Sequence, residues 1–206
     1  MKRKSVCIAA LVLTGSVGSP ASAEEQVPGL FPPLSAKLSP TARRGEYLVR
    51  INSCHDCHTP WKPGPAGPVP DLSRMLSGHP EQVEVPSAPP LAAPWVVAVA
   101  APNTAYAGPW GTSFSANLTP DKETGLGTWT ERNFIEAMRN GRHQGRGRPI
   151  LPPMPWLMVR EHTDSDLKAI WAYLRTIPPI KNRVHDAQPP LAAGSATGTR
   201  DSEIKR

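Results

Sequence analysis

The sequence predicts an all-α fold in which a few helices are joined by long, proline-rich loops. Helical periodicity marks three segments, 41–51, 131–140 and 164–176, and capping residues mark the starts of the last two. Proline supplies 26 of the 206 residues, and because it lacks a backbone N–H it excludes regular structure from the stretches it fills. Hydrophobic residues make up only 39% of the chain, so side chains alone have difficulty building a dense core. A large apolar group bound inside would relieve this shortage.

The first helical segment, 41–51, leads directly into the part of the chain that carries the chemistry. Its apolar positions Tyr47, Leu48 and Ile51 recur at the three-to-four spacing of a helix face. Gly45 has no side chain and offers a place where another helix can approach closely.

The other two helices have clear ends. Thr130 is a favourable N-cap for 131–140, and Gly141 marks its end. Thr163 is the cap of 164–176, which stops before two consecutive prolines. Their apolar faces are formed by Phe134, Ile135 and Met138 on the former and by Leu167, Ile170, Trp171 and Leu174 on the latter.

The N-terminus, 1–23, has the features of a secretion signal. Positive residues at 2–4 precede a short apolar run at 6–13, and a small-x-small pattern ends at Ala23. An uncleaved membrane anchor is the alternative, but the apolar run falls far short of the ~20 residues that a spanning helix needs. We expect cleavage after Ala23, which removes Cys7 and leaves no spanning segment.

The remainder is expected to form one domain, 41–184, between two irregular ends. An extended strap at 24–40 is expected before the domain and a flexible tail at 185–206 after it. Within the domain we expect a short helix at 71–76 and an insertion at about 80–109, which contains a small β-hairpin of 96–100 and 104–107. The role of this insertion stays open.

The net charge argues against a nucleic-acid partner. The formal charge of +6 includes three basic residues at 2–4. Without them, 20 basic residues face 17 acidic ones, and a net charge of +3 is too small to indicate DNA or RNA binding. Aromatic residues are also not interleaved with basic ones as in a stacking platform.

A C-x-x-C-H motif formed by Cys54, Cys57 and His58 is typical of covalent haem attachment. Residues three and four apart share a helix face, so both thiols and the imidazole point the same way. The thiols can then add to the two haem vinyl groups while the imidazole reaches the iron. One such motif is present, which predicts one haem c.

The cysteine pair has three other interpretations. A redox-active dithiol should open a helix after a strand, and neither neighbour resembles a strand. A zinc site needs a second ligand pair at suitable spacing, and none follows. A structural disulfide is the third alternative. The export signal and the histidine that follows the pair favour haem attachment.

The iron of a low-spin cytochrome needs a sixth ligand, and thioether sulfur favours the ferrous state. Met154 is the predicted ligand. It lies between Pro153 and Pro155 in a stretch whose prolines stiffen the loop and present the sulfur. Met158 is the runner-up, and Met138 is interpreted as a core residue on its helix. The remaining rivals are Met75, His55, His79, His143, His162 and His185.

The chain resembles class I c-type cytochromes, and more closely the bacterial cytochrome c domains that partner periplasmic dehydrogenases. The resemblance covers 41–184 and rests on the helix before the haem motif, the proline-flanked methionine and the C-terminal helix. It implies that the N- and C-terminal helices cross around the haem, with Gly45 facing Trp171 or Leu174. The stretch between the haem motif and Met154 is much longer than in minimal members of the family.

Two further site residues are implied by the resemblance. The segment 125–131 is similar to the family segment whose tryptophan contacts a haem propionate, so Trp129 is a candidate for this contact, and a core aromatic is the equal alternative. A proline carbonyl should accept the Nδ1 proton of His58. Pro68 is the predicted acceptor, with Pro63 and Pro65 as competitors.

These features predict a mono-haem electron carrier of the bacterial periplasm that is not itself a catalyst. Its expected partners are redox proteins such as a periplasmic dehydrogenase and a terminal acceptor, with the chain acting as a soluble carrier or a dehydrogenase subunit. The alternatives are a haem enzyme acting on a small substrate and a haem-based gas sensor. Both need an open iron site, which the methionine between prolines argues against.

Overall fold

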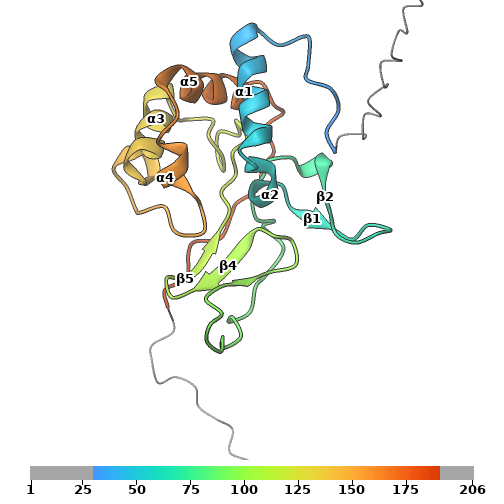
Figure 1. Ribbon diagram of the computed structural model, residues 1–206, viewed down its shortest axis with the longest axis vertical. Helices are drawn as coiled ribbons and strands as arrows, with labels where there is room; N and C mark the ends of the chain where they lie inside the picture. Colours follow the sequence, from blue (N-terminus) through green and yellow to red (C-terminus); the bar gives the residue numbers. More distant parts are fainter. Residues whose placement is uncertain (1–29, 191–206) are drawn as a thin grey trace, which may run out of the picture. The chain divides into compact units, whose positions relative to one another are not determined.

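The computed structural model describes residues 30–190, so the predicted secretion signal and the end of the predicted tail, 191–206, lie outside the described residues (Figure 1). The chain divides into two units after Pro33. Residues 30–33 contain no helix or strand. The helices and strands described below lie in the second unit.

Helices α1 (Pro40–Ile51) and α5 (Asp164–Leu174) pack against each other, and Figure 1 shows α5 between α1 and α3. Side-chain caps fix both starts, with Ser39 accepting from the Ala42 N–H and Thr163 from the Asp166 N–H. The contact needs Gly45, because a Cβ there would lie 1.8 Å from the Ala169 carbonyl oxygen. The predicted close approach at Gly45 is confirmed.

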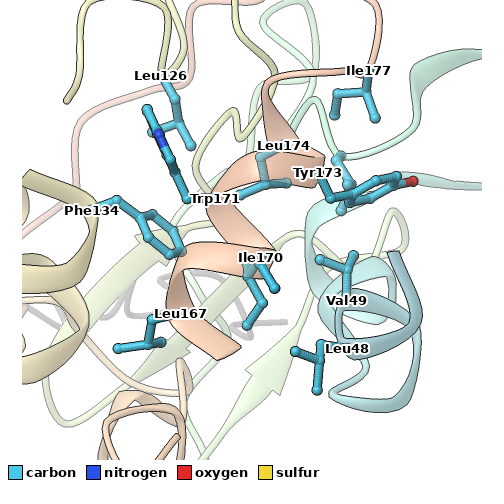
Figure 2. Close-up of a cluster of buried hydrophobic side chains, with 12 residues drawn as sticks. Leu48, Val49, Leu126, Phe134, Leu167, Ile170, Trp171, Tyr173, Leu174 and Ile177 are labelled. Atoms are coloured by element: carbon cyan, nitrogen blue, oxygen red, sulfur yellow. The ribbon is translucent and has the colours of Figure 1, made fainter. Parts of the chain in front are cut away.

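The core forms around the inner face of α5 (Figure 2). The predicted stripe on this helix is buried, but two details differ from the sequence prediction. Gly45 faces Ala169 and Tyr173 and not the residues expected. On α1, Tyr47 and Ile51 are exposed, while Val49 is fully buried. The buried cluster comprises Leu48, Val49, Leu76, Leu126, Phe134, Leu167, Ala169, Ile170, Trp171, Tyr173, Leu174 and Ile177.

Helix α3 (Glu131–Asn140) has the predicted ends. Thr130 and Asn133 form a capping box, and Gly141 adopts the left-handed conformation with φ 63°. Phe134 packs on Trp171 of α5 with ring centroids 5.7 Å apart. The short helix α4 (Trp156–Val159) was not predicted, because four residues are too few to show a periodicity.

Two short 3-10 turns accompany the α-helices. The predicted helix at 71–76 is a single 3-10 turn, η1 (Leu72–Arg74), capped by Asp71. Another 3-10 turn, η2 (His143–Gly145), follows α3. Among the described residues, no helix has the length and apolar character needed to cross a membrane.

Two small antiparallel sheets accompany the helices, so the all-α prediction is only partly right. Strand β1 (Trp61–Lys62) pairs with β2 (Val69–Pro70). The predicted hairpin is present as β3 (Ala98–Val99), which is shorter than expected, and β4 (Ala105–Gly108), which is shifted by one residue. Strand β5 (Gly111–Phe114) extends it to order β3-β4-β5.

The sheet also holds the start of the predicted tail. Thr112 of β5 and Gln188 form an isolated bridge in which each N–H donates to the other's carbonyl, at 2.9 and 2.8 Å. Residues up to Gln188 are therefore tied to β5, whereas the sequence predicted a flexible segment from 185 onward.

Candidate functional site

The C-x-x-C-H motif forms its own short helix, α2 (Cys54–His58), at the end of α1. Ser53 between the two helices has a φ of 56°, and this left-handed residue turns the chain sharply. One helical turn then brings Cys54, Cys57 and His58 to a common cavity. His55 does not line this cavity, and its Nδ1 pairs with the Thr59 hydroxyl at 3.1 Å.

The cavity has a volume of about 670 Å³ and a mostly apolar wall. Its size and its mostly apolar surface are typical of a cofactor site. Several of its wall residues belong to the buried cluster, so the cavity and the core share one surface. The apolar wall includes Val49, Leu118, Leu126, Phe134, Ile170 and Leu174.

His58 is held in the protonation state that a metal ligand needs. It is 8% exposed, and its Nδ1 donates to the Ala116 carbonyl at 2.8 Å. Burial lowers the pKa of His58, which favours the neutral ring. With the proton on Nδ1, Nε2 keeps its lone pair for a metal.

The acceptor for His58 is therefore Ala116 and not Pro68, so that sequence prediction is wrong. Pro68 is exposed in the loop between β1 and β2 and does not line the cavity. The pairing of Trp61 with Pro70 makes this stretch a separate hairpin. The chain after β5 carries Ala116 to the ring instead, and nothing in its sequence signals this role.

The two cysteines are free thiols that line the cavity. Burial raises the pKa of Cys54 to about 12. A redox-active dithiol needs a lowered thiol pKa, so this environment does not favour that alternative. Within residues 30–190, no group of three or more His, Cys, Asp or Glu is arranged to hold a metal ion, and the zinc alternative lacks the ligands it needs.

The structure separates the methionine candidates. Met154 lines the cavity with His58, whereas Met158 is 68% exposed and does not. Met138 also lines the cavity while packing against the buried cluster, in keeping with its core interpretation. Met75 packs against the cluster and does not line the cavity.

Two of the histidine rivals line the cavity, His143 and His185. His143 packs edge-on against Trp129, with ring centroids 4.9 Å apart. His79 is fully buried elsewhere, accepting from Thr104 and donating to the Val83 carbonyl. His162 is engaged by the Asn52 amide and the Val159 carbonyl.

Trp129 lines the cavity and also packs against the buried cluster, so both interpretations offered for it fit its position. The loop at 117–124, before Trp129, was not predicted to belong to the site, although part of it lines the cavity. Asp121 accepts from the Thr124 N–H and hydroxyl, and Asn117 accepts from the Thr119 N–H and hydroxyl. Asx turns of this kind are the sequence signal that would have found the loop.

No protein-family model matches the chain, but similarity to curated proteins is clear. The cytochrome c subunit of a quinone alcohol dehydrogenase from Gluconacetobacter polyoxogenes is 34% identical over 75% of this chain and 25% of the relative. The cytochrome c subunit of gluconate 2-dehydrogenase from Pantoea cypripedii is 28% identical over 72% of this chain and 26% of the relative. The cytochrome subunit of fructose dehydrogenase from Gluconobacter japonicus is 28% identical over 66% of this chain and 21% of the relative.

The chain is thus similar to c-type cytochromes that are subunits of dehydrogenases. It spans about a quarter of the length of these relatives or less. The alignments extend over 161, 149 and 137 residues, so the similarity reaches far beyond the C-x-x-C-H motif itself.

Proposed function

We propose that the chain is a periplasmic c-type cytochrome that holds one haem and transfers single electrons between redox partners. One observation carries the proposal: both thiols and the imidazole of the motif line a single apolar cavity with Met154. Haem bound there supplies a reversible one-electron couple at its iron. The proposal keeps the signal at 1–23 and the strap before α1, and it extends the cytochrome domain from 41–184 to Gln188, because His185 lines the cavity and Gln188 bridges to β5.

The side chains have distinct roles in this proposal. Cys54 and Cys57 hold the haem through thioethers, and His58 and Met154 are the axial ligands. The Ala116 carbonyl fixes the ring of His58 through the 2.8 Å hydrogen bond. Trp129 is the candidate for contact with a propionate. The packing of α1 on α5 supports a class I cytochrome c fold, to which the small sheets are additions.

Haem attachment is tested by producing the chain with its N-terminal segment in a bacterium that attaches haem in its periplasm. The protein should retain one haem per chain after denaturation in acidified organic solvent, since thioethers survive this treatment. A Cys54→Ala, Cys57→Ala double variant should release any haem it has bound. Retention of haem by the double variant would contradict thioether attachment.

Binding of an external ligand to the iron distinguishes the proposed electron carrier from a haem enzyme or a gas sensor. A haem enzyme or gas sensor binds carbon monoxide readily at a reduced, open iron, whereas a site closed by Met154 does not. The reduced protein at neutral pH should therefore keep its spectrum under carbon monoxide. Rapid and complete binding would favour the gas sensor or the enzyme.

The similarity to dehydrogenase subunits supports a dehydrogenase as the donor partner, with a further redox protein as terminal acceptor. The chain acts either as a soluble carrier or as a subunit of the complex. Affinity purification of the tagged protein from its own periplasm separates these two forms. Recovery of a dehydrogenase subunit in equal amount favours the complex, and recovery of the cytochrome alone favours the carrier.

A further inference from the structure

The loop that carries Met154 has few hydrogen-bond donors of its own. Three prolines, Pro152, Pro153 and Pro155, have no backbone N–H. The N–H of Met154 donates to the Leu151 carbonyl at 3.3 Å, within the same loop. Donors from outside are therefore needed to hold the loop against the rest of the fold.

Both ends of the loop are fixed at the C-terminus of α3. The Ile150 N–H donates to the Gly141 carbonyl at 2.8 Å. Beyond the methionine, the ring of Trp156 covers Gly141 so closely that a Cβ there would lie 2.4 Å from the ring. The carbonyls of Met154 and Pro155 accept from backbone N–H groups of α4, but these contacts do not hold the carbonyl of Pro152 before the methionine.

The middle of the loop is tied to β5 by Ser113. Its hydroxyl lies 2.6 Å from the Pro152 carbonyl and 3.3 Å from the Tyr106 carbonyl, so its one proton is donated to the nearer Pro152 oxygen, and the residue is 7% exposed. Strand β5 is itself fixed by backbone hydrogen bonds, because it pairs with β4 and bridges to Gln188 through Thr112. Ser113 also lines the cavity, so this hydrogen bond lies at the site itself.

We propose that Ser113 is a positioning residue that holds the methionine loop closed over the cavity and so keeps Met154 at the iron. This inference rests on the proposed function. Without the hydroxyl, the Pro152 carbonyl loses its partner and the closed loop loses stability relative to the open one. An external ligand that competes with Met154 should then bind more tightly, because less free energy is needed to displace the loop.

The test measures the affinity of the oxidised, haem-loaded protein for imidazole. Ser113→Ala should bind imidazole about tenfold more tightly than the unmutated protein, as expected for the loss of one buried hydrogen bond. Ser113→Thr retains the hydroxyl and should restore the original affinity. Ser77→Ala is the matched control, because Ser77 is also buried and its hydroxyl donates to the Arg74 carbonyl at 2.9 Å, outside the cavity.

The possible results separate this inference from the proposed function. A sulfur-to-iron absorption band in the unmutated protein, together with unchanged imidazole affinity in Ser113→Ala, overturns the role of Ser113 alone. An equal effect of Ser77→Ala also overturns it, because the change then reflects general destabilisation. Absence of the band from the unmutated protein overturns both the ligand assignment and the inference.

Discussion

At the scale of single residues, His58 is the best-defined member of the site. A carbonyl can only accept, so the 2.8 Å contact with Ala116 assigns the ring proton to Nδ1. Burial, which lowers the pKa of His58, acts in the same direction by favouring the neutral ring. Nε2 is thereby left unprotonated, as the proposed ligation of iron by His58 requires.

Met154, the proposed second ligand of the iron, gives the first prediction. Met154→Ala should keep its haem, because the thioethers are untouched, but should lose the sulfur-to-iron charge-transfer band of the oxidised form. Met158→Ala should retain the band, since that side chain is 68% exposed and does not line the cavity. Absorption spectroscopy of the oxidised proteins is the measurement.

Met138→Leu is the stricter control for this prediction, because Met138 also lines the cavity. Its replacement should leave the band in place. Loss of the band in Met138→Leu with retention in Met154→Ala would reverse the assignment.

At the scale of elements, the crossing of α1 and α5 gives the second prediction. Gly45→Ala places a methyl group against the backbone of Ala169, which cannot move aside as a side chain can. The free energy of unfolding should fall by about 2–3 kcal/mol, as in other overpacked cores. Arg43→Ala, at an exposed position of the same helix, should change it by less than about 0.5 kcal/mol. Denaturant unfolding of the haem-loaded protein is the test, and equal effects of both changes would contradict the close crossing.

The loop after α3 gives the third prediction, because the structure separates two of its arginines. Both are exposed, but Arg148 lines the cavity and Arg146 does not. A charge beside the cofactor influences the reduction potential, and an exposed charge steers encounter with an acidic partner. Arg148→Gln should therefore shift the potential. Arg146→Gln should leave the potential unchanged and flatten the ionic-strength dependence of electron transfer.

Potentiometry and stopped-flow kinetics at several salt concentrations check this pair of variants. Unchanged salt dependence in Arg146→Gln would show that docking occurs elsewhere on the protein.

The sequence predicted those elements whose ends carry local signals. Thr130, Thr163 and Gly141 mark helix ends because capping is an interaction within one turn. The cysteine motif and Met154 were found in the same way, from spacing and from flanking prolines. Ala116 was missed because its role depends on β5 returning the chain to α2, a contact between residues 58 positions apart. The burial of Val49 in place of Tyr47 likewise depends on where α5 packs.

At the scale of the whole molecule, the cavity is a large part of the interior. Residues such as Val49, Phe134 and Leu174 belong both to its wall and to the buried cluster. A comparison of the two sets of residues indicates that the proposed haem would complete the core, because the shared side chains would lose apolar contacts without it.

The fourth prediction follows from this comparison. The chain without residues 1–23, produced in the cytoplasm where haem is not attached, should be largely unfolded, as small metal domains are without their ion. Circular dichroism with thermal melting is the measurement. A haem-free protein with a cooperative transition would show that the core stands without its cofactor.

The proposed cytochrome holds one haem per chain and exchanges one electron. The most direct measurement of this property is an equilibrium redox titration of the purified protein, with haem and protein quantified in the same sample. We predict one haem per chain and a single reversible transition with the slope of a one-electron couple. Two haems per chain, or the absence of a reversible one-electron transition, would contradict the proposed function.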